Sequence, residues 1–168
     1  MSPPADRLRA ELPALLPRLR RFGRALTRDR DDADDLLQLA LERALQRAEQ
    51  WQPGTRLDSW MFRIMQNAWI DEGRARRRRA ETFLPEEAGE QVGVSPTEAQ
   101  IDALAVRKAL GTLGDDQRAA VALVWVEGLP YKEAAEVLGI PIGTLTSRLA
   151  RARDALQKLL SDETRTLP

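Results

Sequence analysis

Apolar residues recur at steps of three or four along most of the chain, and this spacing predicts helices. In the first stretch they are Leu12, Leu15, Leu16, Leu19, Phe22 and Leu26. Their spacing places them on one face of a helix. Because proline is tolerated in a first helical turn, we expect this helix to begin near Pro13, with Pro17 in or near that turn. Alternating strand-like runs are hard to find, so the pattern predicts an all-α protein.

Two more helices complete the expected first domain. The second is predicted from Asp32 to Gln50, with Asp31 and Asp32 as N-caps. Its expected buried positions are Ala33, Leu37, Ala40, Leu41, Ala44 and Ala48. Residues 52–55, Gln-Pro-Gly-Thr, predict a turn after it. The third helix is predicted from Asp58 to about Arg79, with its packing side formed by Trp60, Met61, Ile64, Met65 and Ala68.

Residues 80–106 contain no Lys or Arg but several Asp, Glu, Pro and Gly residues. Few of them can bury enough apolar surface to offset the entropy lost on ordering. We therefore expect two small helical domains, residues 1–80 and 98–168, joined by an acidic flexible linker over residues 81–97. In the second domain the predicted helices are Ala99–Leu113, Asp115–Glu127, Tyr131–Leu138 and Ile142–Leu160.

The segment from Tyr131 to Leu149 has the pattern of a helix-turn-helix. The small inner face of its first helix, Ala134, Ala135 and Leu138, lets a second helix cross closely. Gly139 ends the first helix with the left-handed turn that only glycine adopts cheaply.

The second helix of this motif has a polar face opposite its apolar stripe, and that face would enter the major groove of DNA. It holds Thr144, Ser147, Ala150 and Arg151. Thr144, Ser147 and Arg151 can bond to base edges, whereas Arg148 lies toward the flank, where phosphates are the partners. The alternative is a helical hairpin of another bundle with solvated arginines. We favour DNA binding because the turn, the small inner face and the polar outer face coincide.

The third predicted helix ends in a basic cluster, formed by Arg74, Arg76, Arg77, Arg78 and Arg79. Trp60, Asn67 and Trp69 precede it. Arginines hold phosphates, aromatic rings stack on bases and an amide reads a base edge, so this surface suits a strand with unstacked bases. The alternative is arginines that complement the helix dipole beside tryptophans of the core, and the residues alone leave both open.

Composition narrows the class of protein. The 26 basic and 26 acidic side chains give a net charge of zero, so nucleic-acid binding must rest on local segregation of charge. The chain has no Cys and no His, which removes the commonest thiolate, general base and zinc ligands. The sequence also lacks a phosphate-binding glycine loop. We therefore expect no enzymatic activity, cofactor, metal site or small-molecule substrate.

The sequence also bears on location. No apolar run approaches the roughly 18 to 20 residues needed to cross a bilayer. The N-terminal MSPPADRLRAEL is charged where a signal peptide would be apolar. We therefore expect a cytoplasmic protein that does not bind a membrane.

Three segments, in this order, resemble the extracytoplasmic-function (ECF) sigma factors, the smallest members of the sigma-70 family. Residues 34–41, DDLLQLAL, resemble region 2.2. Residues 58–71, DSWMFRIMQNAWID, with the arginines that follow, resemble regions 2.3 and 2.4. Residues 141–153, PIGTLTSRLARAR, resemble region 4.2. The turn at residues 52–55 further resembles the subgroup associated with the general stress response.

The resemblance implies a protein that binds core RNA polymerase and directs it to promoters. The second helix would dock on clamp helices of the largest polymerase subunit through Asp34, Asp35, Gln38 and Glu42. The first domain would open the minus-ten element, with the loop at residues 51–59 as a pocket for a flipped base. Its candidate contacts are Trp60, Arg63, Asn67, Arg74 and Arg77.

The second domain would read the minus-thirty-five element. Thr146, Ser147, Arg148 and Arg151 occupy the matching positions, beside Thr144 of the polar face. Ala150 is small where many family members have a bulkier side chain, which leaves the recognised sequence open. The acidic linker would run through polymerase channels that normally carry nucleic acid, and an anti-sigma factor would cover the polymerase-binding faces.

Two other functions stay open on the residues alone. One is an ordinary helix-turn-helix repressor or activator that acts without polymerase. The other is a helical adaptor that never touches DNA. The N-terminal half shows no ligand pocket and no heptad dimer seam, which speaks against the repressor.

Overall fold

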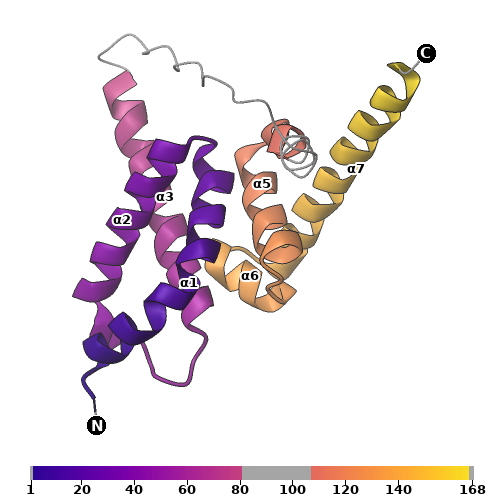
Figure 1. The fold of residues 1–168 in the computed structure, drawn as a ribbon. Coiled ribbons are helices and arrows are strands. Elements are labelled where there is room, and N and C mark those ends of the chain that lie inside the picture. The colour runs from indigo at the N-terminus through magenta and orange to yellow at the C-terminus, as the bar shows by residue number, and fades with distance from the viewer. Residues whose placement is uncertain (1, 81–106, 167–168) are drawn as a thin grey trace.

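The computed structural model describes residues 2–80 and 107–166, and within these ranges every regular element is helical, as predicted. The first domain contains α1 (Pro4–Thr27), α2 (Arg30–Gln46), the 3-10 helix η1 (Ala48–Gln50) and α3 (Leu57–Ala80) (Figure 1). The second contains a short helical stretch at 107–111, α5 (Asp115–Val121), the π-helix η2 (Ala122–Val126), α6 (Tyr131–Leu138) and α7 (Ile142–Thr166). The predicted linker lies outside the described residues.

The first helix begins well before the predicted position. α1 starts at Pro4 rather than near Pro13, and both Pro13 and Pro17 lie inside it. Each interior proline removes a backbone hydrogen bond. Leu8 and Leu12 are buried in the N-terminal turns, and packing of such an apolar face is what stabilises most protein helices. The prediction that Pro17 lies in the first turn is therefore wrong.

The second helix begins two residues early and ends four residues early. Its N-cap is Asp29, whose carboxylate accepts hydrogen bonds from the backbone N–H groups of Asp31 and Asp32 at 2.8 and 2.9 Å. The two predicted caps therefore lie in the first turn, where their charge complements the helix dipole. After Gln46 the chain tightens into η1 instead of continuing the α-helix.

The second domain follows the predicted helix order with one interruption. The backbone N–H of Glu127 donates to the carbonyl of Ala122, five residues back, which is the spacing of a π-helix. The predicted helix Asp115–Glu127 is thus an α-helix followed by a wider π-turn. α6 has the predicted bounds, and α7 continues past Leu160 to Thr166.

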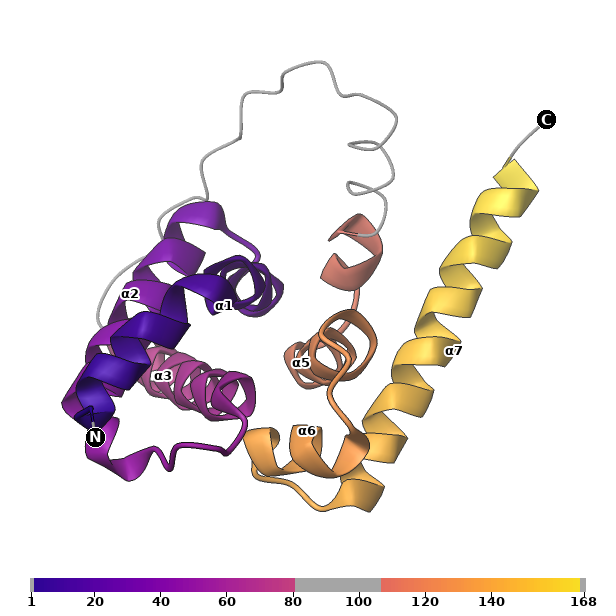
Figure 2. The same ribbon diagram turned by 60° about the horizontal axis from the view of Figure 1, so that its bottom comes forward.

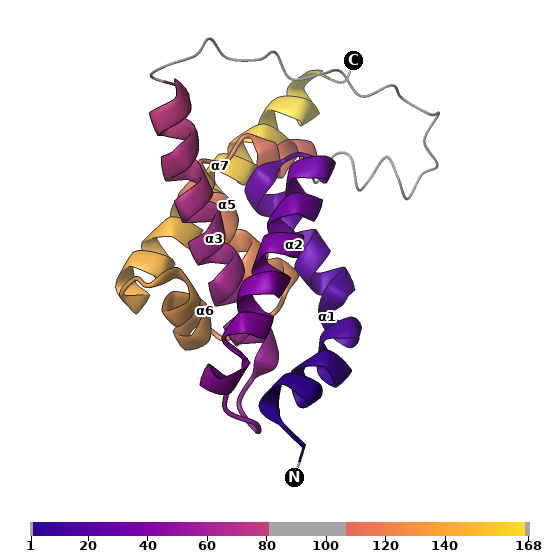
Figure 3. The same cartoon turned by 90° about the vertical axis from the view of Figure 1, so that its left-hand side faces the viewer.

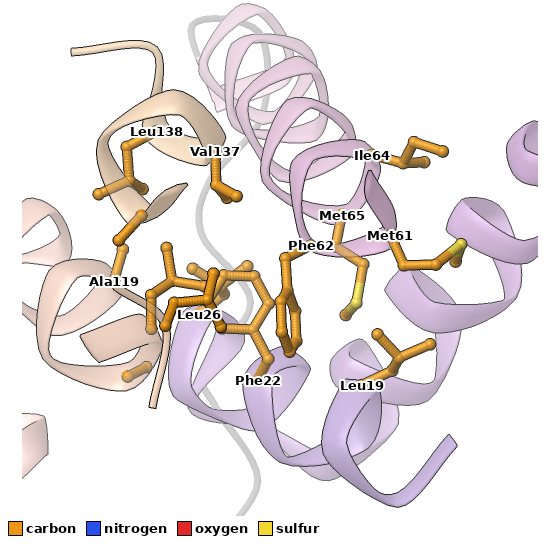
Figure 4. Close-up of a cluster of buried hydrophobic side chains, with 14 of the residues drawn as sticks. Leu19, Phe22, Leu26, Met61, Phe62, Ile64, Met65, Ala119, Val137 and Leu138 are labelled. Carbon is orange, nitrogen blue, oxygen red and sulfur yellow. The ribbon is translucent and has the colours of Figure 1, made fainter. Parts of the chain in front are cut away.

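The two domains pack against each other. α1 contacts α5 and α3 contacts α6, whereas α2 lies on the side away from the second domain (Figures 1 and 2). Phe22 of α1 and Phe62 of α3 meet edge to face, with ring centroids 5.0 Å apart. Ala119 of α5 and Val137 of α6 belong to the same buried cluster (Figure 4). One apolar core therefore extends across both domains.

Candidate nucleic-acid interface

The helix-turn-helix forms as predicted. Gly139 ends α6 in the left-handed conformation, with φ 65°. Ala134, Ala135 and Leu138 are buried on the inner face of α6. The buried residues of α7 against it are Leu145, Leu149 and Ala152. With its apolar stripe covered, α7 presents its opposite face to solvent.

The predicted recognition residues lie on this open face. Thr144, Thr146, Ser147 and Arg151 are all exposed. At 100° per residue, Ser147 lies opposite the core stripe, at the centre of the face. The hydroxyls of Thr146 and Ser147 donate to the carbonyls of Ile142 and Gly143, both at 3.0 Å. Their oxygens keep lone pairs that can accept, and Arg151 adds donors beside them.

Two other arginines of α7 are held at the edges of this face. The Arg148 guanidinium lies 3.8 Å from the Asp116 carboxylate, and 22% of the Arg148 side chain is exposed. The Arg153 guanidinium lies 5.8 Å from the ring centroid of Trp125, within the range of a cation–π contact. Both positions suit contacts with phosphates rather than with base edges.

The predicted minus-ten residues share one face of α3. Arg63, Asn67, Arg74 and Arg77 are exposed and Trp60 is half-buried. Their spacing keeps them within about a third of a turn of one another. The C-terminal turns of α3 extend beyond α2 (Figures 1 and 3). There, a shallow groove is lined by Asp71, Arg74, Arg77 and Arg78.

Arg76 differs from its neighbours because it bonds within the domain. Its guanidinium lies over the ring of Trp69, 5.3 Å from the centroid, and 3.4 Å from the Asp32 carboxylate of α2. Arg43 of α2 makes a second link to α3, 2.9 Å from Asp71. These contacts attach the end of α3 to α2, so the basic cluster is divided between internal and solvent-facing arginines.

The acidic residues predicted to meet polymerase lie on α2. Asp34, Asp35, Gln38 and Glu42 are exposed, and their spacing gives them a common face. Because α2 lies away from the second domain, this face is open to a partner.

The loop before α3 is anchored by an ion-pair cluster around Asp58. Arg56 donates to the Asp58 carboxylate at 2.9 Å, Arg18 at 3.1 Å and the Ser59 backbone N–H at 2.8 Å. Burial acts to raise the pKa of Asp58, but these hydrogen bonds outweigh it and hold the pKa below its ordinary value. Trp51, the first residue of this loop, is buried. A base pocket here would therefore be formed by other residues of the loop.

A set of charged residues between the domains was missed by the sequence analysis. Arg18 and Arg21 of α1 contact Glu127, which follows η2. Arg118 of α5 is 2% exposed and donates to the carbonyl of Leu26. No local pattern indicates these contacts, because 109 residues separate Arg18 from Glu127 and 92 separate Arg118 from Leu26, and each arginine also fits a solvated helix surface.

The described residues contain neither a candidate metal site nor a helix that could span a membrane. No group of three or more His, Cys, Asp or Glu side chains among them could hold a metal ion. None of the helices in the described ranges is long and apolar enough to cross a bilayer.

Comparison with known proteins decides the family. The model of the sigma2 domain of PhyR matches residues 12–66, and the model of sigma-70 region 4 matches residues 103–156. The ECF RNA polymerase sigma factor EcfG of Rhodopseudomonas palustris (strain TIE-1) is 38% identical over 158 residues, which cover 94% of this chain and 87% of that relative. The chain belongs to the ECF sigma factors.

Further likenesses extend over both domains of this sigma factor. SigM of Mycobacterium tuberculosis (strain ATCC 25618 / H37Rv) is 39% identical over 143 residues, 84% of this chain and 71% of SigM. The sigma factor RpoE, solved in complex with the anti-sigma factor NepR from Bartonella quintana, superposes with a TM-score of 0.76 at 34% identity, covering 92% of this chain and 96% of RpoE.

A second solved structure, CnrH in complex with the cytosolic domain of CnrY, gives a TM-score of 0.65 at 25% identity, over 90% of this chain and 85% of CnrH. The predicted family, the all-α fold and the role in promoter-directed initiation are thereby confirmed. A repressor that acts without polymerase is not favoured. The stress-response subgroup stays a prediction.

Proposed function

We propose that this sigma factor binds core RNA polymerase through α2, reads the minus-ten element with α3 and reads the minus-thirty-five element with α7. One observation carries the proposal: both helices that match the DNA-binding regions of the family expose a polar, arginine-bearing face while their apolar faces are buried. The residues of each face stay exposed although the two domains pack against each other.

The face of α3 suits a single DNA strand. Arg74 and Arg77 line a groove for phosphates, and Asn67 lies about two to three turns earlier on the same face with an amide for a base edge. The half-buried ring of Trp60 offers a stacking surface at the start of this face. Asp71, held by Arg43, moderates the positive charge at the groove.

The face of α7 suits duplex DNA. A helix of this kind enters the major groove with its first residues nearest the bases. Thr144, Ser147 and Arg151 are spaced to lie along the groove floor. Arg148 and Arg153, held at the edges by Asp116 and Trp125, would set the register on the phosphates.

We propose an anti-sigma factor as a further partner, because the similar RpoE and CnrH were solved with NepR and with the cytosolic domain of CnrY. Calorimetry with purified NepR provides a direct probe. Binding that prevents assembly with core polymerase is expected. We further propose that the protein acts in the cytoplasm, where polymerase is, and that catalysis belongs to the polymerase.

The test is reconstituted transcription. The purified protein, core polymerase and genomic DNA should yield transcripts whose start sites share two upstream elements. Arg151→Ala should reduce initiation strongly, whereas Arg20→Ala, which removes an equal charge from an exposed position of α1, should not. Absence of both a stable holoenzyme and specific transcripts would refute the proposal. Tight binding of duplex DNA by the protein alone would favour a repressor.

A further inference from the structure

We infer that Glu127 latches the two domains together in the free protein, and that this latch must open before both promoter elements can be read. The second half of this statement rests on the proposed function. The first half depends only on contacts between the domains.

Glu127 is the centre of the contact between α1 and the second domain. Its side chain is 1% exposed. Arg21 donates to its two carboxylate oxygens, from Nε at 2.7 Å and from Nη2 at 3.0 Å. Arg18 donates to the carboxylate at 3.0 Å and to the Glu127 backbone carbonyl at 3.1 Å. A buried carboxylate of the second domain thus obtains its compensating charge entirely from α1 in these contacts.

A second contact joins the C-terminal end of α1 to α5. Arg118 is buried and donates to the carbonyls of Ala25 and Leu26, which lie in the last turn of α1. In return, Arg28 at the end of α1 donates to the carbonyl of Leu113 at 2.9 Å. The last carbonyls of a helix lack partners within it, so Arg118 supplies hydrogen bonds that water would otherwise provide.

A third contact holds the helix-turn-helix on the first domain. Glu133 of α6 accepts from Arg56 at 2.6 Å and from Ser59 at 3.1 Å. Arg56 in turn bonds Asp58, which also binds Arg18. The contacts at Glu127 and Glu133 are therefore connected through one network of charged side chains.

The closed arrangement cannot match a promoter. The two elements are named for positions ten and thirty-five base pairs before the start of transcription, so they are about 25 base pairs, or about 85 Å, apart at about 3.4 Å per base pair. A compact chain of this length has a radius of gyration of about 15 Å. Since α6 rests on α3, its neighbour α7 can reach the distant element only after the domains separate.

The latch acts through spacing rather than by covering the recognition residues. The recognition residues Thr144, Ser147 and Arg151, like Arg74 and Arg77, are exposed while the domains are closed. Each surface could meet its own DNA element alone, but both could not do so at once. Closure therefore lowers the apparent affinity for a two-element target, in proportion to the fraction of molecules that are open.

Distance measurement on the free protein tests the latch. The chain has no cysteine, so spin labels can be placed at Gln46→Cys on α2 and Gln157→Cys on α7, both exposed. We expect one narrow distance distribution for the otherwise unchanged protein and a broad, displaced distribution for Glu127→Gln. Arg24→Gln, an exposed arginine on the same α1, is the matched control and should leave the distribution unchanged. Circular dichroism reports whether each variant is folded.

A cross-link that prevents the domains from separating tests whether opening is required for initiation. A short bismaleimide joining Arg28→Cys to Asp115→Cys, an exposed pair across the two domains, should abolish initiation at a two-element promoter, while the same variant without cross-linker remains active. The latch is refuted by a broad distance distribution in the parent protein, by a folded Glu127→Gln with unchanged distances, or by an active locked protein. If the parent protein itself never initiates, the proposed function fails and the distances still decide the latch.

Discussion

The arginines at the end of α3 and the arginine between the domains are one residue type in opposite environments. Arg74 and Arg77 are exposed and line a groove. Arg118 is 2% exposed and donates to backbone carbonyls of both domains. An exposed guanidinium keeps its water and can exchange it for phosphate, whereas a buried one depends on fixed partners. The partners of an arginine, rather than the number of arginines, therefore locate a DNA surface.

The largest effect is expected from removing the buried arginine. Arg118→Ala leaves carbonyls of α1 without donors and opens a cavity beside Leu113, so the free energy of unfolding should fall by about 3 kcal/mol. Urea unfolding followed by circular dichroism measures this change. The matched exposed substitution, Arg77→Ala, should change stability by less than about 0.5 kcal/mol. Equal losses of stability in both variants would show that the buried and the exposed arginine do not differ in their contribution to folding.

The next effect concerns Arg151, an exposed arginine for which we propose contact with bases. Arg151→Ala should cost about 2 kcal/mol of discrimination at the base pair it contacts, because a bidentate contact to a base edge is lost. Binding of holoenzyme to a set of single-base promoter variants measures it. Folding should be unchanged. A uniform loss over all promoter variants would place Arg151 on a phosphate instead.

Two neighbouring arginines of α3, Arg76 and Arg77, should differ in how their substitution changes the salt dependence of DNA affinity. Arg77→Ala removes a phosphate contact, so the slope of log affinity against log salt should become shallower by about one. Arg76→Ala should leave that slope nearly unchanged and lower stability by about 0.5–1 kcal/mol, because its contacts are with Trp69 and Asp32. Binding titrations at several salt concentrations compare the two. Identical slopes would show that Arg76 also reaches DNA.

The smallest effect is expected from acid. The pKa of Asp58 is lowered in the folded state, so its stabilisation is present above its ordinary value of 3.8 and is lost as pH falls through the folded pKa. Between pH 7 and pH 5 this group should therefore contribute no change. Below about pH 4, the stability of Asp58→Asn should fall less steeply than that of the parent protein. Parallel curves in thermal unfolding at each pH would contradict this assignment.

Local signals predicted the elements well, whereas contacts between distant segments escaped prediction. The bounds of α6 follow from Tyr131 and Gly139, because turn chemistry is written within a few residues. The start of α1 was misplaced because the cost of Pro13 is local while the burial of Leu8 depends on tertiary packing.

The candidate site shows the same division. The open face of α7 follows from periodicity, so Ser147 and Arg151 were found on it. The different use of Arg76 and Arg77 was not predictable, because it depends on Asp32 of another helix. Nor was the burial of Glu127, whose partner Arg18 lies 109 residues away.

The hydroxyl groups on α7 limit which promoter bases this helix can bind. The hydroxyls of Thr146 and Ser147 donate to backbone carbonyls, so in the proposed DNA complex each oxygen would face the groove as an acceptor. In the major groove, only adenine and cytosine offer an amino group to such an acceptor. Guanine and the carbonyl of thymine would need the hydroxyl to turn away from its own helix. If α7 binds as proposed, promoters that depend on this sigma factor should share adenine or cytosine on the strand that these two hydroxyls face.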